Sequence, residues 1–174
     1  NFNGVIDDLK PIVDSDCSDS AALDAAIELL VNSDRSLPMA KIVTIPEAWA
    51  HRRDFSKKLK NLYAYANAVM EPWDGPAAIC GVHNNWAIAG MDRNGLRPIR
   101  YIRTKEYLIA GSEAGMVEID ESKIIEKGRV GPGQMIAVNF SESKFYNDDK
   151  IKSLLSLSKP FSDWTKKITH IDKL

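Results

Sequence analysis

The sequence predicts an α+β fold with antiparallel sheets, because helical patterns and strand patterns occupy separate parts of the chain. We expect helices within residues 18–70, mostly strands within 77–146 and connecting helices within 148–174. Short turns separate the successive strand patterns. Antiparallel strands can be joined in this way, whereas parallel strands need a long crossover. The arrangement therefore favours a layered α+β structure over a parallel βαβ one.

The first helix is expected directly after residues 14–20, a run of capping residues that reads D-S-D-C-S-D-S. Apolar Leu23, Ala26, Ile27 and Leu30 then recur at the spacing of one helical face. A polar N-cap followed by this periodicity is the usual signature of an amphipathic helix.

Four more helical segments follow the same reasoning. A short helix is predicted to begin near Pro38, which suits a first turn, and to stop before Pro46. Residues 55–70 carry one apolar face and one lysine-rich face. Such lysines usually form a solvated helix back, although an RNA or membrane surface is an alternative. Weaker helical patterns cover 148–157 and 161–168.

Two hairpins are predicted in the centre of the chain. Residues 77–82 and 86–91 flank a His-Asn-Asn turn, and asparagine tolerates the left-handed conformation that such turns need. Residues 99–103 and 107–110 form the second pair.

The rest of the strand region is more irregular. We expect short extended pieces at 116–119 and 124–125, and a Gly-Pro-rich loop at 128–133. A strand is expected at 135–139, followed by an edge strand at 145–146.

Composition and charge exclude several classes of protein. The 174 residues are enough for one domain with a real core, and 44% hydrophobic with 27% charged residues is ordinary for a globular protein. The net charge of −1 gives no global field toward nucleic acid or an anionic membrane. No apolar run approaches the roughly 20 residues that span a bilayer.

The cysteines and histidines predict neither a disulfide framework nor a metal centre. Cys17 and Cys80 form no CxxC pair, which fits a reducing compartment such as the cytoplasm. Cys80 falls in a predicted strand, so we expect a small buried side chain. His51, His83 and His170 are too scattered in sequence to indicate a metal site.

The Ser18-Asp19-Ser20 run is the first candidate site, and two interpretations stay open. One is a helix cap, with Asp19 favoured by the positive end of the helix dipole. The other is that the Asp19 carboxylate binds an ammonium group, because charge-assisted hydrogen bonds are strong. Both can hold at once.

The second candidate is residues 92–98, D-R-N-G-L-R-P. Asn94-Gly95 can adopt positive φ, and Arg97 is expected to pair with a carboxylate such as Asp92 or Glu113. We expect a structural turn here rather than a site. Cys17 is a weak candidate nucleophile, because a cysteine activated by its own α-amine must be the first residue of the mature chain.

Several blocks taken together resemble a known family. They are S-D-S-A-A-L-D at 18–24, R-S-L-P at 35–38, I-P-E-A-W at 45–49, M-E-P-W-D-G-P-A-A at 70–78, D-R-N-G-L-R-P-I-R-Y at 92–101, S-E-A-G at 112–115, K-G-R-V-G-P-G at 127–133 and P-F-S-D-W at 160–164. This set resembles the class II, N-terminal-nucleophile glutamine amidotransferase domain of the glutamate synthase large subunit.

The resemblance implies that residues 1–174 are the C-terminal portion of one such domain, part of a four-layer αββα sandwich. The family's glutaminase hydrolyses glutamine to glutamate and ammonia for the reductive amination of 2-oxoglutarate. By this resemblance Asp19, with Ser18, binds the substrate glutamine. The nucleophilic cysteine is expected upstream of this chain, so the chain alone is expected to be inactive, with no catalytic residue within it.

The resemblance also implies partners and cofactors outside this segment. FMN and an iron–sulfur cluster are expected in other domains of the large subunit, together with a small NADPH-oxidising subunit. Two departures concern the region near Asp19, since the family tends to have histidine where Met39 stands and glycine where Cys17 stands. A non-catalytic binding module on this scaffold, or another class II amidotransferase such as the enzyme that opens purine synthesis, remain alternatives.

Overall fold

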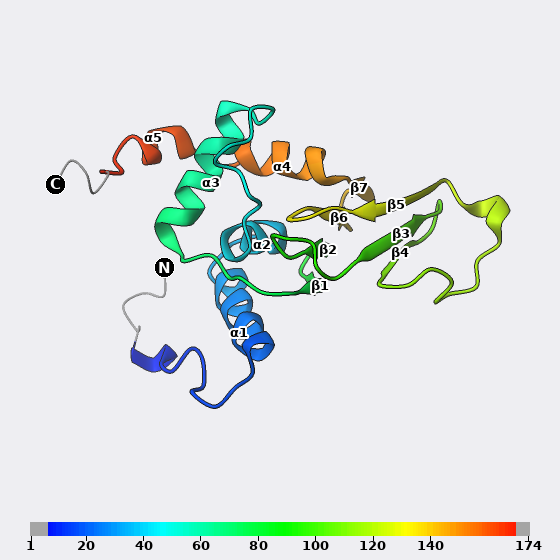
Figure 1. The fold of residues 1–174 in the computed structure, drawn as a ribbon, viewed down its shortest axis with the longest axis horizontal. Helices are drawn as coiled ribbons and strands as arrows, with labels where there is room; N and C mark the ends of the chain where they lie inside the picture. The colour runs from blue at the N-terminus through cyan, green and yellow to red at the C-terminus, as the bar shows by residue number, and fades with distance from the viewer. Residues whose placement is uncertain (1–6, 170–174) are drawn as a thin grey trace.

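The computed structural model describes residues 7–169 and shows helices first and strands second, as the sequence predicts (Figure 1). The helices are α1 (Asp19–Asn32), α2 (Leu37–Thr44), α3 (Lys57–Val69), α4 (Asp148–Leu157) and α5 (Phe161–Thr165). Two short 3₁₀ turns, η1 (Asp7–Leu9) and η2 (Glu121–Lys123), accompany them. All five expected helices are confirmed, although α3 spans 57–69 instead of 55–70 and the last helix ends at Thr165 instead of Ile168.

Side-chain caps explain where three helices begin. The Ser18 Oγ accepts a hydrogen bond from the Ala21 amide at the start of α1. The same arrangement recurs at Ser56 before α3 and at Asn147 before α4. Each cap satisfies one of the amide groups that have no partner within the helix.

Helix α2 is buried on every side. All of its residues from Leu37 to Thr44 are buried, including Lys41 and Thr44. It contacts α1, α3 and α4, and it also packs on β1 and β2. A helix that is apolar nearly all round belongs in the core, and α2 is the centre of the helical half.

The seven strands form two antiparallel sheets. They are β1 (Ala78–His83), β2 (Trp86–Met91), β3 (Ile99–Arg103), β4 (Leu108–Gly111), β5 (Glu126–Val130), β6 (Met135–Asn139) and β7 (Lys144–Tyr146). Sheet A has the order β1-β2-β6-β7, and sheet B has the order β4-β3-β5. Both predicted hairpins are confirmed, and Asn84 in the first turn has φ 49°, as its residue type allows.

The elements stack as helices, then sheet A, then sheet B. One core cluster joins α1 to α4 with the helix-facing side of sheet A, through residues such as Leu62, Met135 and Ile151. A second cluster lies between the sheets and includes Met91 from β2 and Tyr101 from β3. The described residues therefore form three layers, α-β-β, and Figure 1 shows sheet B projecting away from the helices.

Two expectations about strands are wrong. Residues 128–130 belong to β5, which pairs with β3, instead of a loop. The reason is close packing, since a Cβ at Gly128 would lie 2.4 Å from the Tyr101 ring, so a glycine is required inside this strand. Of the short extended pieces expected at 116–119 and 124–125, neither belongs to a strand, although the backbone of Ile124 is extended.

The expected burial of Cys80 is also wrong. Cys80 is exposed on β1, an edge strand of sheet A, and its neighbour on the same face, Val82, is 72% exposed. The opposite face of β1 packs toward α2, where Gly81 approaches Leu37.

Candidate functional site

The start of α1 holds the residues that sequence reasoning put forward. Ser18 has extended backbone angles and caps the helix, with its Oγ 3.3 Å from the Ala21 amide and 3.2 Å from the Ser20 Oγ. Asp19 is the first residue of the helix and is exposed. Among residues 7–169, no hydrogen bond or ion pair engages the Asp19 carboxylate.

The capping interpretation and the ligand interpretation therefore fall on different residues. Ser18, and not Asp19, provides the cap, which leaves both oxygens of Asp19 available for a ligand. Asp19 nevertheless lines none of the five best-defined cavities in the described part of the chain. Residues 7–169 thus supply one exposed carboxylate at this point.

The D-R-N-G-L-R-P block is a structural turn, as expected. The Asp92 Oδ1 accepts hydrogen bonds from the amides of Asn94 (2.9 Å) and Gly95 (2.8 Å), and Oδ2 accepts from Leu96 (3.0 Å) and Ala77 (3.2 Å). Burial of Asp92 raises the pKa of its carboxyl, but these amide donors outweigh burial and lower the pKa below its ordinary value.

The expected ion pair of Arg97 is wrong. Within the described residues, the Arg97 side chain forms no ion pair with Asp92 or Glu113. The Asp92 oxygens are already occupied by backbone amides, and Arg97 is exposed at the surface of the turn.

A buried ionic cluster, which sequence reasoning missed, lies beside this turn. The Lys152 Nζ donates to the Glu47 Oε2 and, at 2.6 Å, to the Asp148 Oδ2. The other Glu47 oxygen accepts from Arg52 at 2.8 Å. Lys152 and Glu47 are only 3% and 6% exposed, so the cluster replaces water with paired charges.

Lys41 of α2 extends this cluster toward the strands. Its ammonium donates to the carbonyls of Gly133 (2.8 Å) and Ile45 (3.2 Å). Burial, aided by the charge of Lys152, lowers the pKa of Lys41 to about 7, against the opposing effect of Asp148 and other carboxylates nearby. A lone lysine within an otherwise apolar helix was the signal in the sequence that could have identified it.

The sequence blocks therefore meet at one junction. Glu47 of I-P-E-A-W packs against Gly133 of K-G-R-V-G-P-G, where a Cβ would lie 2.8 Å from the Glu47 Cα. The Gly133 amide in turn donates to the Asp92 carbonyl at 2.7 Å. These contacts join the segment that follows α2, the turn that follows β2 and the loop that precedes β6, which is a structural role.

The described residues offer no evident metal centre. No group of three or more His, Cys, Asp or Glu side chains within residues 7–169 is arranged to hold a metal ion. His170 lies outside the described residues. None of the helices in the described range is both long and apolar enough to cross a bilayer.

Comparison with known proteins decides the family. Residues 1–164 match the family of class-II glutamine amidotransferases. The chain belongs to this family. It is 46% identical over 174 residues to the glutamate synthase [NADPH] large chain of Azospirillum brasilense, covering 99% of this chain and 12% of that protein.

Other relatives of this class-II amidotransferase differ in the reductant that their names state. A ferredoxin-dependent glutamate synthase of Pyropia yezoensis is 42% identical over 91% of this chain and 10% of its own length. The glutamate synthase [NADH] of Saccharomyces cerevisiae is 38% identical over 99% of this chain and 8% of its own length. The chain thus spans about a tenth of the length of these relatives.

Proposed function

We propose that this chain is the C-terminal portion of the glutaminase domain of a glutamate synthase. The observation that carries the proposal is the similarity to glutamate synthases over nearly the whole chain, with the S-D-S block at the start of α1. The reaction is the hydrolysis of glutamine to glutamate and ammonia. The ammonia then serves the reductive amination of 2-oxoglutarate elsewhere in the same protein.

Asp19 binds the α-ammonium group of glutamine in this proposal. Its support is geometric, since Ser18 performs the capping and leaves the Asp19 carboxylate directed to solvent at a fixed helix start. A cationic amine is the natural partner of such a carboxylate. The remaining walls of the pocket come from residues outside 7–169.

The nucleophile of the proposed reaction is a cysteine outside this chain. Its thiolate attacks the side-chain amide carbon of glutamine, ammonia leaves, and water then cleaves the thioester to release glutamate. Cys17 does not fit this role, because it is not a first residue with its own α-amine to act as base. The 174 residues alone are therefore inactive.

The proposal includes partners and a compartment. The large chain contributes the remaining domains, which carry FMN and an iron–sulfur cluster. Electrons come either from NAD(P)H, through a small NADPH-oxidising subunit, or from ferredoxin. None of these cofactors is assigned to residues 1–174. The protein works in the cytoplasm.

The test uses the full-length large chain and the variant Asp19→Asn. We expect kcat/KM for glutamine hydrolysis to fall by about 10- to 150-fold, the usual loss for a hydrogen bond to a charged group. Synthesis of glutamate from added ammonium should be unchanged, because ammonium bypasses the glutaminase. Glu28→Gln, which removes another exposed carboxylate of α1, is the matched control and should leave kcat/KM unchanged.

Two results would contradict the proposal. The first is an Asp19→Asn variant that hydrolyses glutamine as fast as the unsubstituted protein. The second is ammonia release by the 174-residue chain that disappears on Cys17→Ala. A full-length protein that hydrolyses no glutamine would favour the non-catalytic binding module instead.

A further inference from the structure

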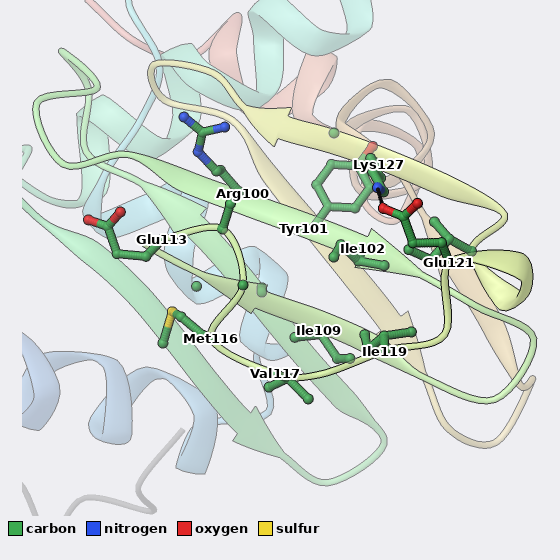
Figure 2. A pocket seen from close by; sticks show the side chains of 16 residues that line it. Arg100, Tyr101, Ile102, Ile109, Glu113, Met116, Val117, Ile119, Glu121 and Lys127 are labelled. Carbon is green, nitrogen blue, oxygen red and sulfur yellow. Dashed lines mark hydrogen bonds and ion pairs between the residues drawn. The ribbon is translucent and has the colours of Figure 1, made fainter.

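Two cavities of the described residues differ in chemistry. An apolar groove of about 410 Å³ runs along the outer face of sheet B, where Figure 2 shows Ile102 and Ile109 beside Met116 of the loop that follows β4. The second cavity, of about 280 Å³, is lined mainly by polar side chains. The second cavity is therefore the better place for a polar ligand.

The polar cavity lies where the connection from α1 to α2 meets the turn of the first hairpin. Ten residues line it, namely Val31, Asp34, Arg35, Ser36, Leu37, His83, Asn84, Asn85, Trp86 and Asn139. The connection follows the last turn of α1, whereas Asp19 begins that helix. Because α1 has 14 residues, about 20 Å separates the cavity from Asp19.

Asn139 of β6 presents a buried donor to this cavity. The residue is only 6% exposed, and its Oδ1 accepts hydrogen bonds from the Ser141 Oγ (2.7 Å) and the Glu142 amide (3.1 Å). Since a backbone amide can only donate, the second bond identifies the oxygen, and the other atom is the Nδ2 donor. This Nδ2 has no acceptor among residues 7–169.

The unpaired Asn139 nitrogen is open to the cavity and not sealed within the core. Among residues 7–169, the Tyr63 hydroxyl is the only fully enclosed side-chain polar atom that lacks a partner. The Asn139 Nδ2 also lacks one, so it must be reached from the cavity that Asn139 lines. Buried donors are almost always satisfied in folded proteins, which indicates an acceptor that enters this cavity.

The first turn of α2 adds unpaired backbone amides. Ser36 is the N-cap residue, but its side chain makes no capping hydrogen bond, in contrast to the N-caps of α1, α3 and α4. The amides of Leu37 and Met39 have no acceptor within residues 7–169, and Pro38 between them has no amide hydrogen. Ser36 and Leu37 line the cavity. An uncapped helix start of this kind favours a bound anion.

The charged groups around the cavity favour an anion as well. The Arg35 guanidinium donates to the Ser33 Oγ at 2.9 Å and forms no ion pair in the described range. The His83 imidazole also lines the cavity and can donate a hydrogen bond. Asp34 is the one carboxylate among the lining residues, and it is exposed, so solvent screens its charge.

We propose that this cavity binds a small oxyanion, the carboxylate or phosphate group of a small molecule. The oxyanion accepts hydrogen bonds from the Asn139 Nδ2 and from the amides of Leu37 and Met39, and Arg35 balances its charge. The volume of about 280 Å³ admits only a small molecule. This site goes beyond the proposed function, which assigns no ligand to this end of α1.

Hydrogen–deuterium exchange of the full-length protein tests the site. The protein is first dialysed against chloride, and the probes are inorganic phosphate and succinate, each compared with chloride at equal ionic strength. Overlapping peptides across residues 33–40, labelled for short times, report the amides of Leu37 and Met39. An oxyanion at about ten times its Kd should slow their exchange about tenfold, because exchange then proceeds from the unliganded fraction.

Two variants with matched controls identify the groups that bind the oxyanion. Asn139→Asp keeps the Oδ1 that supports the turn but replaces the Nδ2 donor with a charged acceptor, so the slowing should disappear. Asn67→Asp makes the same change on the exposed side of α3 and should keep it. Arg35→Gln should reduce the slowing at a fixed concentration of oxyanion, and Arg53→Gln, at an exposed position outside the cavity, should not.

Each outcome decides for or against the site. Slowing that Asn139→Asp abolishes supports it, and the probe that acts at the lower concentration separates a phosphate ligand from a carboxylate one. Equal slowing in Asn139→Asp and in the unsubstituted protein would overturn the proposal, as would no slowing by either probe. Amides already protected in chloride would overturn it too, because another part of the protein would then fill the cavity. If Asn139→Asp does not fold, Arg35→Gln decides in the same way.

Discussion

The two sheets differ in how many of their faces are covered by other elements. Sheet A has helices on one face and sheet B on the other, and residues such as Met135 and Ala137 are fully buried. Sheet B is packed on one face only, and all four residues of β4 are partly exposed. On the side of sheet A even the charges are buried and paired, whereas Arg100 and Arg129 of sheet B face outward without an ion pair in the described range.

The difference shows that the same sequence blocks contain two kinds of residue, those that form buried contacts and those that are exposed. Glu47, Asp92 and Gly133 hold the junction beside sheet A through buried contacts. Arg97 and Arg100, from the same D-R-N-G-L-R-P-I-R-Y block as Asp92, are exposed. A change in the first group should therefore cost more stability than a change in the second.

Removal of a buried charge should have the largest effect. Lys152→Met leaves Glu47 and Asp148 buried with one fewer cation, so we expect a loss of about 3–5 kcal/mol in the free energy of unfolding. Urea denaturation of the 174-residue chain measures it. The matched control is Lys166→Met, whose pair with Asp163 is exposed, and it should leave the unfolding midpoint nearly unchanged. Equal losses of stability in Lys152→Met and Lys166→Met would show that the buried ion pairs stabilise the fold no more than the exposed one.

Two glycines with the same backbone conformation sharpen the comparison further. Gly133 has φ +69° and Gly115 has φ +79°, so alanine suffers similar backbone strain at both. Only Gly133 is crowded, since its new Cβ would lie 2.8 Å from the Glu47 Cα, whereas nothing lies within 4 Å of one at Gly115. Gly133→Ala should therefore cost about 1–3 kcal/mol more than Gly115→Ala in urea denaturation. A larger loss at Gly115 would show that the loop over sheet B is the tighter region.

The pH dependence of stability should show the smallest effect per single pH unit. The folded-state pKa of Lys41 is about 7, below the ordinary value of 10.5, so between these values the unfolded chain binds more protons. Stability should therefore rise from pH 7 toward pH 9.5, by at most about 1.4 kcal/mol per pH unit. Below pH 7 Lys41 is protonated in both the folded and the unfolded chain, so its titration adds no further change in stability with pH.

Lys41→Met should flatten that part of the curve, and Lys57→Met, at the exposed start of α3, should not. Urea midpoints at pH 7, 8 and 9 measure the slope. A slope that survives in Lys41→Met would assign the titration to another group.

Local patterns in the sequence were sufficient to predict most of this fold. Periodicity and caps predicted α1 to α4, and asparagine at the turn predicted the first hairpin. The failures come from contacts between distant residues. Gly128 looked like a turn residue because nothing nearby in the sequence shows that Tyr101 lies over it. Cys80 looked buried because the sequence does not reveal which strand lies at the edge of a sheet.

The candidate site was predictable only in part. The helix start at Ser18 and the turn at Asp92 follow from local hydrogen-bonding rules, and the structure has both. The ligand role of Asp19 depends on the resemblance to a family and stays a prediction. The buried pairing of Lys152 with Glu47 joins residues 105 positions apart, so no local pattern could have indicated it.

The enclosure of α2 has a consequence for how the chain reaches its native state. Because three helices and two strands surround this segment, it cannot be inserted after its neighbours have closed around it. The transition state for folding should already hold α2 against β2, with much of the chain between them looped out. During synthesis, α2 would therefore reach its native packing only after β2 has left the ribosome.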